Sequence, residues 1–120
     1  MKYLLMIHVN PAALDALSEE DRQAIFAEHD KFTALTKESG ELVGFAALAD
    51  PAATTTVRVR DNVPAITDGP YVEAKEFLAG YYVIDVEDLN RATELAAMIP
   101  DARFTAIEVR PVMESGGAEM

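Results

Sequence analysis

The residues best suited to chemistry gather around a turn in the middle of the chain, between Asp68 and Glu76. The tripeptide Asp68-Gly69-Pro70 favours a sharp turn, because glycine tolerates unusual backbone angles and proline has a fixed φ and no amide donor. Acidic side chains and Lys75 follow this turn closely. Such a concentration of charge beside a turn is typical either of a solvated loop or of the wall of a functional site.

The chain has two histidines, and the unperturbed pKa of a histidine, about 6.5, suits proton transfer. His29 falls at the rim of the apolar stripe of a predicted helix, beside Ile25 and on the same flank as Thr33. We predict that His29 is a general acid or base and that Asp68 orients it and stabilises its charged form. A boundary histidine hydrogen-bonded to nearby backbone is the alternative interpretation.

Four further residues are candidates for substrate binding: Met6, His8, Lys75 and Tyr82. His8 ends the first predicted strand on the side that carries Met6, and Tyr82 with Met6 is expected to line the wall of a pocket. Lys75 could neutralise an anionic substrate, or it could pair with a neighbouring glutamate at the surface, where an ion pair contributes little to stability.

Metal and cofactor sites are not expected. The histidines and carboxylates show no recognised ligand spacing, and the chain has no cysteine. The glycine-rich motifs that bind dinucleotides and phosphates are absent from the sequence. We therefore predict no metal and no cofactor.

Apolar alternation and turn residues divide the chain into strands and two long helices. Strands are predicted at residues 2–9, 41–48, 55–60, 77–85 and 105–112, with a short edge piece at 64–67. One helix is predicted from a cap at Ser18 to Gly40, and the other from the acidic segment 85–88 to Pro100. This order predicts an α+β, ferredoxin-like fold, with two helices on one face of an antiparallel sheet.

The two helices cover only one face of this sheet, yet the other face is also expected to be apolar. The residues assigned to that bare face are Leu4, Met6, Leu78, Tyr82, Ile84, Ile107 and Val109. A large uncovered apolar face marks an interface or a ligand cavity. We therefore predict a homodimer that packs sheet against sheet, with a small-molecule pocket near the seam between the subunits.

Composition limits the classes of protein to which this chain can belong. Its 120 residues fit one domain, predicted at 1–112, followed by a flexible polar tail at 113–120. The net charge of −11 argues against a nucleic-acid surface, and no segment reaches the ~20 apolar residues of a membrane span. The first strand does not read as a signal peptide, and the lack of cysteine fits the cytoplasm.

The segment Ile66–Glu76, followed by Gly80–Asp85, resembles the "DGPF" signature of the YCII-related proteins. Tyr71 stands where that signature usually has phenylalanine, which is a mild aromatic exchange. The opening strand and the two strands at 56–60 and 107–111 match as well, so the resemblance extends from residue 1 to about residue 112. It implies a ferredoxin-like domain that forms a dimeric α/β barrel.

The same resemblance implies two kinds of function. In one branch of the family a histidine of the first helix and a nearby aspartate are proposed as an active-site dyad, and His29 matches that histidine by its distance from Gly40–Gly44. One relative is a dehydrochlorinase of chlorinated hydroxyquinone breakdown, which favours acid/base elimination or isomerisation on a small carbonyl or ring-containing molecule. Other relatives resemble segments joined to extracytoplasmic-function sigma factors, which favours a non-catalytic module that binds a small molecule or regulates a partner.

Overall fold

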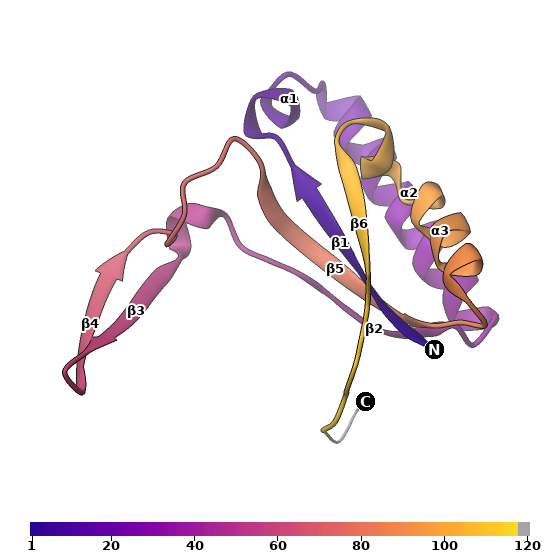
Figure 1. The fold of residues 1–120 in the computed structure, drawn as a ribbon. Helices are drawn as coiled ribbons and strands as arrows, with labels where there is room; N and C mark the ends of the chain where they lie inside the picture. The colour runs from indigo at the N-terminus through magenta and orange to yellow at the C-terminus, as the bar shows by residue number, and fades with distance from the viewer. Residues whose placement is uncertain (118–120) are drawn as a thin grey trace.

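In the computed structural model, which describes residues 1–117, helices α2 and α3 pack on one face of a four-stranded antiparallel sheet (Figure 1). The strands are β1 (Lys2–Val9), β2 (Leu42–Ala47), β5 (Phe77–Asp85) and β6 (Ala106–Pro111), in the order β2-β5-β1-β6. The helices are α2 (Glu19–Glu38) and α3 (Leu89–Met98). The predicted α+β, ferredoxin-like arrangement is confirmed.

The ends of α2 follow the sequence signals. The Ser18 hydroxyl accepts a hydrogen bond from the Asp21 amide at 3.1 Å, and the first turn is acidic, which suits the positive end of the helix dipole. Gly40 follows the last turn with a φ of 78°, a conformation that glycine adopts without strain. The predicted extent of this helix is therefore confirmed.

Three short helical elements were not expected from the sequence. Helix α1 (Pro11–Asp15) follows β1 directly, and its first amides are capped by the side chain of Asn10. The 3₁₀ turns η1 (Pro51–Ala53) and η2 (Pro100–Arg103) begin with proline, whose fixed φ suits a first helical position. At the C-terminal end, residues 112–117 form no helix or strand, and residues 118–120 of the predicted tail lie outside the described residues.

The hydrophobic core lies between the helices and the sheet. Alternate residues of β1 are buried there, together with Phe32 of α2 and Leu95 of α3. Leu89, which begins α3 directly after the Asp88 cap, is 53% exposed. None of the helices within residues 1–117 combines the length and the apolar character needed to cross a membrane.

The predicted composition of the bare sheet face is wrong for four residues: Tyr82, Ile84, Ile107 and Val109. Directly opposed residues share a face of a sheet, and buried Leu5 is opposite both Tyr82 and Val109. A β-bulge explains the error in β5, since Ile7 pairs with Gly80 whereas His8 pairs with Leu78. The alternation therefore shifts between Leu78 and Tyr82.

The bare face is consequently less apolar than predicted. In β1 it carries Leu4, Met6 and His8, which alternate with the buried positions. In the register, Leu4 is opposite Val83 and Arg110, and Met6 is opposite Tyr81 and Glu108. The face is thus a mixture of apolar and charged side chains.

Strands β3 (Thr55–Arg60) and β4 (Val63–Asp68) form a separate two-stranded sheet, named here the arm (residues 55–68). The predicted strand and edge piece pair with each other rather than joining the main sheet. At the tip, Asp61 and Asn62 have φ values of 50° and 66°, as a tight hairpin turn requires. Figure 1 shows the arm projecting from the body on the side away from α2 and α3.

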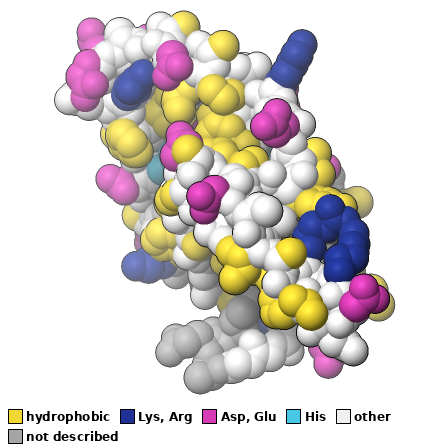
Figure 2. Space-filling model, turned by 90° about the vertical axis from the view of Figure 1, so that its left-hand side faces the viewer, with side chains coloured by type: hydrophobic (Ala, Val, Ile, Leu, Met, Phe, Trp, Pro, Cys, Tyr) yellow, Lys and Arg dark blue, Asp and Glu magenta, His cyan; other side chains and the backbone are white. Residues whose placement is uncertain are grey.

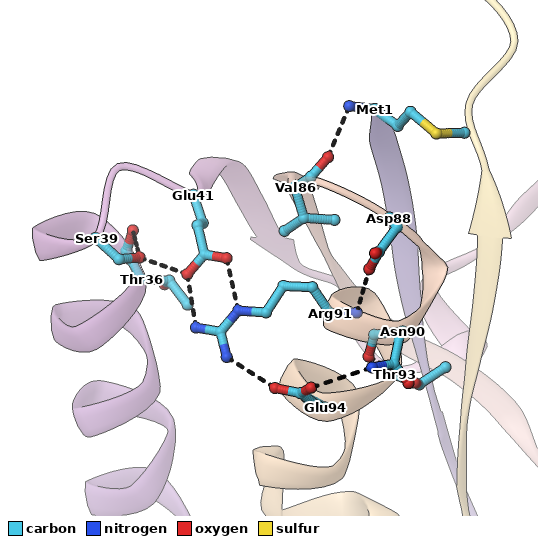
Figure 3. A network of polar contacts seen from close by, with 10 residues as sticks. All are labelled: Met1, Thr36, Ser39, Glu41, Val86, Asp88, Asn90, Arg91, Thr93 and Glu94. Atoms are coloured by element: carbon cyan, nitrogen blue, oxygen red, sulfur yellow. Dashed lines mark hydrogen bonds and ion pairs between the residues drawn. The ribbon is translucent and has the colours of Figure 1, made fainter.

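An ion pair joins the segment after α2 to helix α3 (Figure 3). Arg91 donates from Nε and Nη2 to the two carboxylate oxygens of Glu41, at 2.8 and 2.9 Å, and Ser39 donates to the same carboxylate at 2.7 Å. The hydrogen bonds from Arg91 and then Ser39 lower the pKa of Glu41 to about 2. The ionised form of Glu41 is therefore favoured by folding.

We expect the Glu41–Arg91 ion pair to make the free energy of unfolding depend on pH in the acid range. The pKa of Glu41 is about 2 in the folded chain against an ordinary value of 4.5, so its contribution is complete above pH 4.5 and is lost as the pH falls towards 2. Glu41→Gln should lower the thermal unfolding midpoint near neutral pH, and the difference from wild type should shrink by about pH 3. Glu94→Gln, which removes a more exposed partner of Arg91, is the control. A loss of the same size at both pH values would contradict the assignment.

Candidate functional site

The imidazole of His29, on α2, is held between two side chains from distant parts of the chain. Nδ1 lies 2.7 Å from the hydroxyl of Tyr82 on β5, and Nε2 lies 2.6 Å from Oδ1 of Asp101 in η2. The side chains of His29 and Asp101 are 22% and 17% exposed, and Tyr82 is buried. The three residues thus form one shielded hydrogen-bonded chain, Asp101–His29–Tyr82.

Packing holds the hydrogen-bonded series Asp101–His29–Tyr82 in place at both of its ends. The Tyr82 ring lies on the helix-covered face of β5, 4.7 Å from the ring of Phe32 and 5.9 Å from that of Phe45, measured between centroids. Asp101 directly follows Pro100, which begins η2 at the end of the α3 segment. Arg103 of η2 donates to Glu28 of α2 at 2.6 Å, which joins η2 to the helix that carries His29.

The pKa of Tyr82 bears on which of the groups Asp101, His29 and Tyr82 donate hydrogen bonds. Burial raises the pKa of the Tyr82 phenol, a hydrogen bond with Thr33 opposes the rise, and the charges of Asp101 and Asp30 add to it. The phenol therefore keeps its proton and can donate a hydrogen bond to Nδ1 wherever that nitrogen carries no proton. A neutral His29 then carries its proton on Nε2 and donates to the Asp101 carboxylate, as hydrogen-bond complementarity requires.

A cleft of about 790 Å³ opens beside this chain, between α2 and the sheet. Its volume lies in the range of sites for small molecules. The walls are largely apolar and include Ile25, Phe26, Phe45, Leu48, Phe77 and Ala79. Phe26 of α2 and Phe45 of β2 are 70% and 56% exposed, so two aromatic rings face the solvent in the cleft. His29, Tyr82 and Asp101 all line it.

The structure brings together only two of the residues selected from the sequence, His29 and Tyr82. Asp68 is exposed at the end of the arm, and the ring nitrogens of His29 contact Tyr82 and Asp101 instead. Lys75 is exposed in the segment between β4 and β5. None of Asp68, Lys75, Met6 or His8 lines the cleft.

Met6 and His8 lie on the bare face of the sheet, and the His8 imidazole pairs with the carboxylate of Glu108. The cleft itself lies on the helix-covered side rather than on this bare face. A role for Met6 and His8 in substrate binding therefore stays a prediction. It would require a second binding surface, on the bare face of the sheet. Within residues 1–117 no group of three or more His, Cys, Asp or Glu side chains is placed to hold a metal ion.

Sequence reasoning missed Asp101, the carboxylate that contacts His29. The two residues are 72 positions apart, and no periodicity relates them. The available signal was the position of Asp101 directly after Pro100, at the end of the second predicted helix, which packs next to the first in a ferredoxin-like fold. Phe45 was also missed, because only the register of β2 against β5 places it beside Tyr82.

The fold and the site together define a class: an α+β protein of ferredoxin-like type with a histidine–carboxylate pair beside a cleft. Residues 1–115 match the family of the YCII-related domain, and the chain belongs to that family. It is also similar to an uncharacterized protein of Rhizobium meliloti, with 28% identity over 114 residues that cover 93% of this chain and 92% of that protein. The resemblance inferred from the sequence is confirmed.

Proposed function

We propose that this YCII-related protein is an enzyme that transfers a proton on a small ring-containing or carbonyl-bearing molecule. One observation carries the proposal: the hydrogen-bonded chain Asp101–His29–Tyr82 reaches a cleft of about 790 Å³ with largely apolar walls. A histidine held in this way by a carboxylate is the common arrangement for general acid–base catalysis. Asp101 takes the orienting role that the sequence suggested for Asp68.

The hydrogen-bonded series Asp101–His29–Tyr82 can act as a proton relay. A proton leaves a carbon of the substrate for the Tyr82 oxygen while the phenolic proton passes to Nδ1 of His29, and Asp101 stabilises the imidazolium. The electron pair of the broken C–H bond stays with the substrate, where it forms an enolate or expels a leaving group. Return of the proton from His29 through Tyr82 to another atom of the substrate completes an isomerisation.

The walls of the cleft favour a flat molecule with one polar end. The exposed rings of Phe26 and Phe45 offer faces on which a ring can stack. Arg22 also lines the cleft, seven residues before His29 and therefore about 10 Å away along α2. Its guanidinium donates to the Leu14 carbonyl at 3.0 Å and has further N–H donors for a carbonyl oxygen of the substrate.

Deuterium exchange tests the proposal without a known substrate. The protein is incubated in D₂O with a pool of small cyclic ketones, phenols and hydroxyquinones, and each compound is inspected by NMR for replacement of carbon-bound hydrogen. We expect exchange in at least one compound that also shifts the His29 resonances. Compounds that shift His29 without any exchange would overturn the enzyme and support the non-catalytic binding module.

We also propose that the protein is a cytoplasmic homodimer. The support for the dimer is the bare face of the sheet, where Leu4 and Met6 of β1 are only half-buried. Helices α2 and α3 lie on the other side of the sheet (Figure 1). The lack of cysteine supports the compartment. Sedimentation velocity at micromolar protein concentration should show a dimer, and a stable lone protomer would contradict it.

A further inference from the structure

The arm has one apolar face that no other part of residues 1–117 covers. Opposed pairs place Val57 with Ile66 and Val59 with Pro64 on this face. Val57, Val59 and Ile66 are 59%, 58% and 68% exposed. Figure 2, which views the molecule from the side of the arm, shows hydrophobic side chains at the surface there. The apolar face is therefore continuous across both strands and open to solvent.

The opposite face of the arm is more polar, although Ala65 and Val63 lie on it beside the arginines, and it has a partner of its own. It carries Arg58 and Arg60, and the Arg58 guanidinium lies 5.5 Å from the centroid of the Tyr71 ring. Apolar residues on one face and polar residues on the other are typical of a sheet that is buried on one side only. A two-stranded hairpin alone is at best marginally stable in water. The sequence of the arm is thus that of a hairpin with a covered face.

The extended shape of the molecule fits a second copy of this chain as the cover. The radius of gyration is 16.4 Å, whereas a compact domain of this length has about 14 Å. The arm projects on the side of the sheet opposite to the helices, which is the side of the bare face (Figure 1). A two-fold partner packed against the bare face therefore stands next to the arm and covers both surfaces.

We propose that the arm of each protomer docks with its apolar face on the body of the partner, an inference that rests on the homodimer proposed above. Each arm is neutral, since Asp61 and Asp68 balance Arg58 and Arg60, whereas the whole chain carries −11. A neutral arm approaches an acidic partner without the repulsion that two acidic surfaces would meet. The φ values of Asp61 and Asn62, 50° and 66°, fit the tight turn that joins the two strands of the arm.

Docking of the arm also supports the cleft. β2, which carries Phe45, runs through Leu48 and η1 into β3, and β4 returns through the Asp68–Glu76 turn to Phe77 of β5. Phe45, Leu48 and Phe77 all line the cleft. An arm fixed on the partner restrains both ends of this wall, so assembly and ligand binding become linked.

Paramagnetic broadening between subunits tests where the arm lies. Because the chain has no cysteine, Thr67→Cys provides a single attachment point for a spin label on the polar face of the arm. The spin-labelled variant is prepared without ¹⁵N enrichment and mixed with ¹⁵N-enriched wild-type protein to form mixed dimers. Broadening of ¹⁵N signals then arises only from the partner's arm. We expect broadening of a contiguous set of amides on the body.

Two substitutions on neighbouring residues of β4 provide the matched control. Ile66→Asp puts a charge on the apolar face and should raise the dimer dissociation constant about tenfold or more. Ala65→Asp puts the same charge on the opposite face of the arm and should change the dimer dissociation constant little. A dimer without intersubunit broadening would contradict docking of the arm but not the homodimer. A monomer would contradict both proposals. Equal effects of the two substitutions would also contradict the docked arm.

Discussion

Replacing His29 with glutamine should slow carbon–hydrogen exchange in the substrate by about 10²–10⁴-fold, the usual contribution of a general acid or base. Glutamine still forms hydrogen bonds but cannot take up a proton from Tyr82. The side chain of His29 is 22% exposed at the edge of the cleft, so the fold should survive the change. Exchange is measured in D₂O by NMR, and circular dichroism checks the fold.

The chain offers a matched control for this variant in its other histidine. His8 lies on the bare face and does not line the cleft, so His8→Gln should leave unchanged the exchange rate of a compound bound in the cleft. A pair of aspartate variants separates the two possible partners of His29. Asp101→Asn removes the charge that stabilises the imidazolium and should slow exchange, whereas Asp68→Asn should not. Exchange that persists at the wild-type rate in His29→Gln would remove His29 from the mechanism.

The fold could be predicted from the sequence because its signals are local. Ser18 and Gly40 mark the ends of α2 through caps that involve only neighbouring residues. Alternation identified the strands, and the order of elements then left few topologies. The face of Tyr82 was predicted incorrectly because the bulge opposite Ile7 and His8 depends on how β5 pairs with β1.

The candidate site was harder to predict because it depends on tertiary contacts. His29 was selected from its position at the rim of a helical stripe, and the structure places it in the cleft. Its carboxylate partner was sought in the charged turn near Asp68, because that turn concentrates acidic residues. The contact with Asp101 exists only because η2 packs on α2 beside the Arg103–Glu28 ion pair, and such docking leaves no pattern in the sequence.

Gly80→Ala should destabilise the protein by about 1–3 kcal/mol, the usual cost of forcing extra volume into a packed interior. A Cβ at Gly80 would lie 2.6 Å from the backbone oxygen of Ala46 and 3.3 Å from the Cα of Ala47. A methyl group there must push β2 away from β5, because the atoms that it meets belong to the backbone. Urea unfolding followed by circular dichroism measures the loss.

Gly44→Ala is the matched control on the neighbouring strand. A Cβ at Gly44 meets nothing within 4 Å, and the φ of Gly44 is not in the left-handed region, so the stability of this variant should stay within about 0.5 kcal/mol of wild type. Equal stability of the two variants would show that β2 can shift without cost. If Gly80→Ala alone is destabilised, it should also bind ligand more weakly, because the same displacement moves Phe45 and the β2 wall of the cleft away from Tyr82.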